Sequence, residues 1–157
     1  MPPERRGLMP KISILPLEKE DIPEIAKLEK LCFSQPWSEK AFLDAITGGN
    51  SYFVAAKTPE NLIVGYGGMY FAAGEGYIYN IAVKKDFRGQ KIGQNIIKKL
   101  IDYSLEKNLE FLSLEVRESN IPAINLYKKM NFKIMCKRRD FYSLPKEDAF
   151  IMTLFLK

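Results

Sequence analysis

DFRGQKIGQN, residues 86–95, lies between an apolar run, YIYNIAV (77–83), and a helix-like run, NIIKKLIDYSL (95–105). A helix that starts here after a strand presents backbone N–H groups without partners, and its dipole favours negative charge. Gly89 and Gly93 have no Cβ to keep a diphosphate from the backbone, and Arg88 and Lys91 add positive charge. The stretch is therefore a candidate anion site, although a glycine-containing turn with solvated basic residues has the same pattern.

Two common phosphate-binding motifs are absent from this stretch. A Walker phosphate loop needs GxxxxGK[ST], and a dinucleotide-binding fold needs GxGxxG. Neither pattern occurs in residues 86–95. The anion site is thus of a different kind.

The apolar patterns on both sides of this stretch predict an α/β fold. Strands are expected over 11–17, 51–57, 62–71, 77–83, 111–117, 132–142 and 149–157, and helices over 18–33, 38–44, 89–107 and 120–130. Three consecutive strands with short turns favour an antiparallel meander, and the later strand–helix–strand units favour parallel neighbours with right-handed crossovers. We expect one domain over 11–157 with a mixed sheet of about seven strands and about four helices, after a flexible leader, 1–10.

The composition is that of an ordinary globular chain of 157 residues, 46% apolar and 27% charged. Its apolar runs are far shorter than the roughly 20 residues of a membrane span, and no apolar stretch follows the charged N-terminus as in a secretion signal. The net charge of +5 weakly favours acidic partners. Cys32 and Cys136 are too few for a disulfide framework and are expected to be buried thiols of a cytoplasmic protein.

The chain contains no histidine. Ser-His-Asp and Cys-His mechanisms are therefore excluded, and a catalytic zinc site is disfavoured, so we expect no metal. Acid–base chemistry must depend on Glu, Asp, Tyr, Cys, Lys or the backbone.

A second informative stretch is FLSLEVRESNIPAINLYKKMNF, residues 111–132. Glu115 is a carboxylate in the middle of a strand, where charge is costly unless it is paired or used, and an ion pair with Arg117 or another cation would also explain it. Tyr127 lies on the apolar face of the next helix, where an ordinary core aromatic is the simpler explanation. Asn120 taken alone is a helix cap.

These stretches resemble a known family. IAVKKDFRGQKIG (81–93) resembles the central motif, R/Q-x-x-G-x-G/A, of the GNAT acyl-CoA-dependent N-acetyltransferases. LEVRxSNxxAxxLYxxxxF (114–132), CFSQPWSEKAF (32–42) and RRDFYSLPKEDAFIMTL (138–154) resemble its branch of bacterial ribosomal-protein alanine N-acetyltransferases. Lys91 and Asn131 stand where glycines are typical; Lys91 should avoid positive φ, whereas Asn131 tolerates a left-handed helix end.

The resemblance implies a GNAT-like mixed central sheet, acetyl-CoA as cosubstrate, Glu115 as general base and Tyr127 as general acid. It also implies that main-chain groups pair with the pantetheine arm, that a loop holds the pyrophosphate, and that an asparagine binds the cofactor. These cofactor-binding residues are Ile81, Ala82 and Val83 for the arm, Arg88, Gly89, Gln90, Lys91, Ile92, Gly93 and Gln94 for the pyrophosphate, and Asn120.

The acceptor implied by the resemblance is the N-terminal alanine of a small-subunit ribosomal protein. A protein α-amine has a pKa near 8 and a lysine one near 10.4, so a carboxylate base removes a proton more easily from an N-terminus. Trp37 and Tyr142 would line the acceptor channel, although core packing and a place at a strand edge explain them as well. A lysine or small-molecule acceptor and a non-catalytic CoA-binding module remain open, whereas direct contact with nucleic acid or a membrane is not expected.

Overall fold

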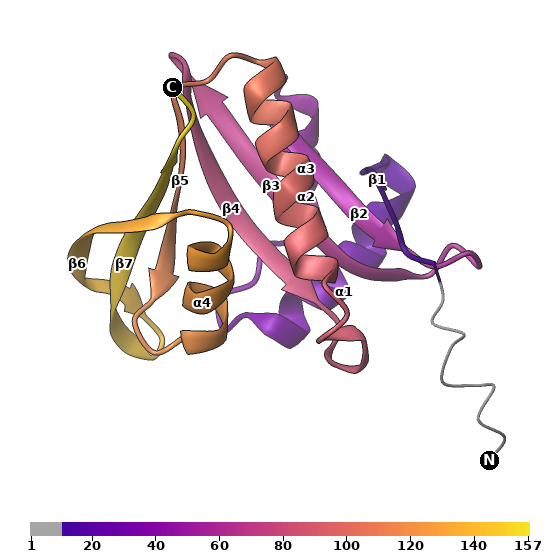
Figure 1. Ribbon diagram of the computed structural model, residues 1–157. Helices are drawn as coiled ribbons and strands as arrows, with labels where there is room; N and C mark the ends of the chain where they lie inside the picture. Colours follow the sequence, from indigo (N-terminus) through magenta and orange to yellow (C-terminus); the bar gives the residue numbers. More distant parts are fainter. Residues whose placement is uncertain (1–10) are drawn as a thin grey trace, which may run out of the picture.

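The computed structural model describes residues 11–157, so the predicted leader, 1–10, lies outside the described residues. One seven-stranded sheet has the order β1-β2-β3-β4-β5-β7-β6, with α1 and α2 on one face and α3 and α4 on the other (Figure 1). The strands are β1 Ser13–Pro16, β2 Ser51–Lys57, β3 Ile63–Ala72, β4 Glu75–Val83, β5 Phe111–Arg117, β6 Lys133–Ser143 and β7 Lys146–Phe155. The helices are α1 Ile22–Cys32, α2 Glu39–Thr47, α3 Ile92–Glu106 and α4 Ile121–Lys129, with 3-10 turns η2 Lys19–Asp21 and η3 Lys85–Phe87. The predicted mixed α/β fold is confirmed.

Helix ends follow local sequence chemistry. Ser38 caps α2 by accepting a hydrogen bond from the backbone N–H of Ala41, and Asn120 caps α4 in the same way through Ala123. Asn131 follows α4 at φ 73°, as its tolerance of the left-handed region predicts. No helix within residues 11–157 is long and apolar enough to cross a bilayer.

The pairing of the last strands differs from the prediction. β2, β3 and β4 form the expected antiparallel meander, and β4 and β5 are the expected parallel neighbours. The expectation that β6 would lie parallel beside β5 is wrong, because β7 lies between them and is antiparallel to both. β7 carries the buried residues Ala149 and Met152, whereas β6 is exposed along nearly all its length and rich in Lys and Arg, as suits an edge strand.

β4 and β5 separate soon after they begin. They pair only over Glu75–Tyr77 and Phe111–Ser113, although β4 continues to Val83 and β5 to Arg117. Figure 1 shows the two strands diverging, with α4 beside the opening. The edge of β4 that faces away from β3 is therefore unpaired beyond Tyr77.

A β-bulge in β4 lies beside this opening. The register between β3 and β4 shifts where Gly68 faces Asn80 and Met69 faces Ile78, which leaves Tyr79 as the extra residue. Tyr79 packs in the apolar cluster under α1 and α2, and Asn80 contacts α1, whereas Ile78 and Ile81 belong to the core under α3. The bulge thus turns the consecutive side chains of Tyr79 and Asn80 toward the same side of the sheet, that of α1 and α2.

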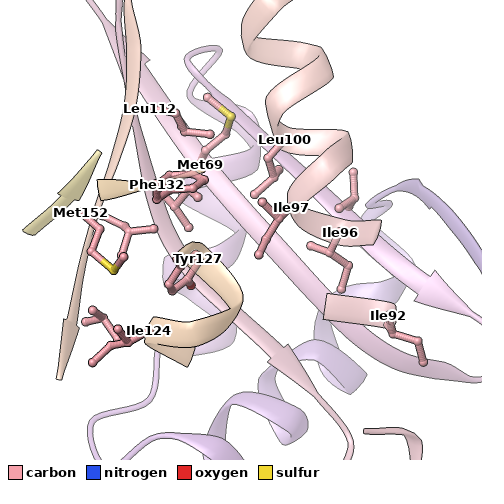
Figure 2. Packing of buried hydrophobic residues seen from close by; sticks show 14 of the residues in the cluster. Met69, Ile92, Ile96, Ile97, Leu100, Leu112, Ile124, Tyr127, Phe132 and Met152 are labelled. Atoms are coloured by element: carbon pink, nitrogen blue, oxygen red, sulfur yellow. The ribbon is translucent and has the colours of Figure 1, made fainter. Parts of the chain in front are cut away.

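The larger core lies between the sheet and α3 and α4 (Figure 2). In Figure 2, Ile92, Ile96, Ile97 and Leu100 extend from α3 toward strand residues such as Met69, and α4 contributes Ile124 and Tyr127. Gly67 permits this packing, because a Cβ there would lie 2.4 Å from Cγ2 of Ile96. The core therefore fixes α3 and α4 on either side of the opening between β4 and β5.

Candidate active site

A cavity of about 740 Å³ lies between the end of β4, the start of α3 and α4. Every residue predicted to bind the cofactor lines this cavity except Gln90. They are joined by Cys32 and Phe33 from the end of α1, by Phe87, and by Pro122, Ala123, Leu126, Tyr127 and Lys129 from α4. The sequence prediction thus identified most of one continuous wall.

The loop before α3 does not have the predicted backbone. Lys91 has φ 62° and ψ 18° as the N-cap of α3, so the prediction that it avoids positive φ was wrong. The helix begins at Ile92 rather than at Gly89, which has φ 80°. Two left-handed residues turn the chain from η3 into a 15-residue helix, and for a lysine this conformation costs about 1–2 kcal/mol.

The other charged and small residues of the loop are held in place. Arg88 donates a hydrogen bond from Nε to the Val83 carbonyl over 3.0 Å, and its Nη2 lies 3.9 Å from Sγ of Cys32. A Cβ at Gly93 would lie 3.2 Å from Cδ2 of Leu126, so a side chain there would press on α4. The glycine therefore keeps the start of α3 close to α4 and the backbone open to the cavity.

A second cavity, of about 270 Å³, adjoins the first. Glu115, Arg117 and Tyr142 line it, together with Asn80 and the loop after α1. Both cavities are lined by Cys32, Phe33, Ile81, Asn120, Ala123 and Tyr127. The predicted cofactor residues and the predicted base therefore lie on two sides of one junction, and Tyr127 lies at that junction.

Tyr127 combines core packing with a free hydroxyl. Its ring centroid lies 5.6 Å from that of Phe132, and only 8% of the residue is exposed. Burial, and to a smaller degree the nearby Tyr142, raises the pKa of Tyr127 well above its ordinary value. The hydroxyl has no hydrogen-bond partner within residues 11–157, yet it is not fully enclosed. At neutral pH it is a protonated phenol that faces the junction of the cavities.

Glu115 forms an ion pair with a cation other than Arg117. Its Oε1 lies 3.6 Å from Nη1 of Arg138, and its side chain is 35% exposed. Arg117 instead forms an ion pair with Glu147 over 3.2 Å and donates to the carbonyls of Leu144 and Pro145. The Arg138 guanidinium is itself 55% exposed, so the pair is open to solvent and leaves the Glu115 carboxylate accessible from the cavity.

The two predicted acceptor-site aromatics differ in position. Tyr142 lines the second cavity, where the Arg117 guanidinium lies 4.1 Å from its ring centroid and where burial raises the pKa of Tyr142 to about 12. Trp37 lines neither cavity. Its ring packs against Tyr79 at 4.6 Å and Phe42 at 5.3 Å, so the alternative of core packing describes it.

The loop after α1 closes one side of the second cavity. Ser34 donates a hydrogen bond to the Leu144 carbonyl, and Nε2 of Gln35 lies 3.3 Å from Oγ of Ser143. These contacts join the loop to the turn between β6 and β7. Two segments far apart in the sequence therefore meet at this side of the second cavity.

One buried residue of this region was missed by the sequence analysis. Glu29 of α1 is fully buried, and its Oε1 accepts a hydrogen bond over 2.9 Å from Nδ2 of Asn80. Burial raises the pKa of Glu29 to about 7, although the Trp37 backbone and the Asn80 amide both favour the charged form. Its Oε2 still has no hydrogen bond of normal geometry within residues 11–157. The available signal was its spacing, four residues after Ile25 on the apolar face of α1.

The two cysteines differ in exposure. Cys32 is half-buried at the junction of the cavities, but Cys136 is exposed, so the expectation of two buried thiols was wrong for Cys136. Cys136 lies on the edge strand β6, which is exposed along nearly all its length. Residues 11–157 contain no group of three or more Cys, Asp or Glu side chains that could hold a metal ion.

The model of the Acetyltransferase (GNAT) family matches residues 22–132, which include every residue that lines the first cavity and all but Tyr142 of those that line the second. The chain belongs to the GNAT acetyltransferase family. A [Ribosomal protein bS18]-alanine N-acetyltransferase of Escherichia coli (strain K12) is 33% identical over 144 residues, which cover 90% of this chain and 96% of that protein. A protein of the same name from Haemophilus ducreyi (strain 35000HP / ATCC 700724) is 27% identical over 141 residues, covering 88% and 96%.

Two solved structures have the same fold. The crystal structure of the ribosomal-protein-S18-alanine N-acetyltransferase from Escherichia coli has a TM-score of 0.85 and 30% identity, and covers 94% of this chain and 95% of its own. Arabidopsis thaliana NAA60, solved with a bisubstrate analogue, has a TM-score of 0.85 at 20% identity, covers 92% and 98%, and supports the fold alone. The GNAT-like sheet predicted from the sequence is therefore confirmed.

Proposed function

We propose that this chain transfers an acetyl group from acetyl-CoA to a protein N-terminal α-amine, that of the N-terminal alanine of a small-subunit ribosomal protein. The observation that carries the proposal is the junction at Tyr127, where a cavity lined by the predicted cofactor loop meets one lined by Glu115. The relatives named for acetylating the alanine of bS18 support this choice of acceptor. We further propose a single domain over residues 11–157 after a leader, 1–10, and a cytoplasmic protein without direct nucleic-acid or membrane contact.

The first cavity fits acetyl-CoA. The unpaired edge of β4 offers main-chain groups of Ile81–Val83 to an extended pantetheine arm, as an added strand would pair. The start of α3 offers backbone N–H groups and the positive charge of Lys91 to a pyrophosphate. Asn120 uses its Oδ1 to cap α4, so its place in the cavity wall leaves its amide NH₂ for the cofactor.

Acetyl-CoA supplies the thioester whose C–S bond breaks as the new C–N bond forms. Glu115 accepts the proton that the α-ammonium must lose before its nitrogen can attack. Tyr127 donates its proton to the departing sulfur, and its burial keeps the phenol protonated until then. A backbone N–H near Val83 stabilises the oxyanion. The site needs no histidine and no metal for these steps.

The ion pair at the base suits an ammonium acceptor. Arg138 holds a positive charge 3.6 Å from Glu115, at the place where an acceptor ammonium must arrive. Both partners are substantially exposed, so their attraction is weak and an incoming cation can replace the guanidinium. The predicted role of Glu115 as base and its observed ion pair are therefore compatible.

The test uses two matched peptides. The first begins Ala-Arg with a free α-amine and contains no lysine, and the second has a blocked N-terminus and one internal lysine. Each is incubated with the protein and acetyl-CoA, and mass spectrometry locates the acetyl group. Acetyl on the α-amine alone is the expected result. Transfer to lysine alone would keep the chemistry and replace the acceptor, whereas CoA binding without transfer to either peptide or to polyamines would favour a non-catalytic CoA-binding module.

A further inference from the structure

Asn80 lies where the β4 bulge meets the acceptor cavity. The bulge directs its side chain toward α1, and the residue forms part of the second cavity wall with Glu115, Tyr127 and Tyr142. No sequence motif gave Asn80 a role. Among the residues of this wall, it is the one whose side-chain amide is bonded to a fully buried carboxylate, that of Glu29.

The bond to Glu29 determines which way the Asn80 amide faces. A carboxylate oxygen accepts hydrogen bonds, so the NH₂ group of the amide must point toward Oε1 of Glu29. The amide oxygen, Oδ1, is left on the other side. It has no hydrogen-bond partner within residues 11–157 and is not among the fully enclosed polar atoms. Asn80 therefore presents a hydrogen-bond acceptor of fixed orientation to the cavity.

We propose that Oδ1 of Asn80 binds the acceptor amine and that Glu29 is a positioning residue that holds the Asn80 amide in the binding orientation. An ammonium carries several N–H donors, so it can bond to Asn80 while another of its protons passes to Glu115. Two fixed hydrogen-bond acceptors orient the ammonium nitrogen better than the Glu115 carboxylate alone, because each acceptor removes one direction in which the ammonium can turn. The inference rests on the proposed acetyl transfer, and it adds a residue that contacts the acceptor.

The variants distinguish this role from a structural tie between α1 and β4. Asn80→Leu keeps the side-chain size and removes Oδ1. Glu29→Gln still offers a carbonyl oxygen to the Asn80 NH₂ group, whereas Glu29→Met fills the same space and offers none. Glu24→Met, at an exposed position of the same helix, controls for the loss of a carboxylate from α1.

Steady-state kinetics with the Ala-Arg peptide measures KM for the acceptor and for acetyl-CoA separately. Since one hydrogen bond to a charged group is lost, Asn80→Leu is expected to raise KM for the peptide about tenfold and to leave KM for acetyl-CoA unchanged. Glu29→Met should raise the peptide KM severalfold, whereas Glu29→Gln should keep the peptide KM close to that of the unaltered protein. Calorimetric titration of the peptide into each CoA-loaded protein should rank the dissociation constants of the variants in the same order as their peptide KM values, without turnover.

Two results would overturn the inference. A folded Asn80→Leu protein with an unchanged peptide KM and dissociation constant would remove Asn80 from the acceptor site. Equal losses of peptide and acetyl-CoA binding in Glu29→Met and Glu29→Gln would make the pair a structural tie only. Failure of the unaltered protein to acetylate any amine would instead contradict the proposed function, so the two failures are distinguishable.

Discussion

Replacing Glu29 by glutamine is expected to change how the free energy of unfolding depends on pH. Burial raises the pKa of Glu29 from 4.5 to about 7, so the folded protein binds this proton more tightly than the unfolded chain does. The resulting stabilisation is fully present below about pH 4.5 and is lost as the pH rises through about 7. The unaltered protein is therefore penalised at high pH by a charge that Glu29→Gln cannot acquire.

The size of this penalty follows from the pKa. At about 1.36 kcal/mol for each pKa unit, the change from 4.5 to about 7 corresponds to roughly 3 kcal/mol in full, most of it between pH 5 and pH 8. Urea unfolding of both proteins across this range gives the difference in stability at each pH, and groups shared by the two proteins cancel. The stability of Glu29→Gln relative to the unaltered protein should rise by about 2–3 kcal/mol from pH 5 to pH 8.

The assay measures a slope, so a constant offset from placing an amide in the site does not matter. Glu24→Gln is the matched control, because Glu24 is on the same helix with an exposed ion pair to Lys27, and its curve should run parallel to that of the unaltered protein. Parallel curves for Glu29→Gln and the unaltered protein would refute the reasoning. They would mean that Glu29 titrates alike in the folded and unfolded chains.

Three further substitutions test the site. Glu115→Gln is expected to lower kcat at least a hundredfold with little change in the dissociation constant of acetyl-CoA, because the proposed role of Glu115 is to act only on protons. Initial rates and calorimetry check this, and equal loss of both would make Glu115 structural. Tyr127→Phe should stay folded, with a melting temperature within a few degrees of that of the unaltered protein. Its turnover in acetyl-transfer assays should be at least tenfold slower, and an unchanged rate would remove Tyr127 from the mechanism. Lys91→Gly should raise the free energy of unfolding in urea by up to about 1 kcal/mol, because glycine adopts positive φ without strain. The same variant should bind acetyl-CoA a few times more weakly, because it lacks the ammonium. Tighter binding would show that the lysine does not contact a phosphate.

Local patterns predicted most of the fold, because its elements have strong signals of their own. The apolar periodicity of residues 92–106 gave α3, and capping residues such as Ser38 and Asn120 marked where helices begin. The inner position of β7 was not predicted. The order of β6 and β7 depends on which of the two strands buries more apolar surface, and no local pattern gives that comparison. Near the end of α1, the apolar residue Leu31 is 80% exposed, which apolar periodicity alone does not predict.

The site was predicted in its residues more than in its geometry. The motifs identified ten of the eighteen residues that line the first cavity and the two residues proposed for proton transfer, but they do not show that two cavities meet at Tyr127. Arg138 reaches Glu115 from a strand two positions away in the sheet, a contact that follows from the pairing of β5, β7 and β6 and from no local pattern. Trp37 shows the opposite error. Its place in a motif led to the prediction that it lines the acceptor channel, but its ring packs in the core.

Two residues that break local rules lie beside the two cavities. Lys91 adopts a left-handed conformation that disfavours lysine, and it lines the first cavity. Glu29 is a buried carboxylate, one oxygen of which has no hydrogen bond of normal geometry within residues 11–157, and its side-chain partner Asn80 lines the second cavity. An apolar side chain of similar size in place of Glu29 would avoid the cost of burying a charge. Such costs are expected where a residue serves binding rather than folding, and here each of them fixes a polar group on a cavity wall.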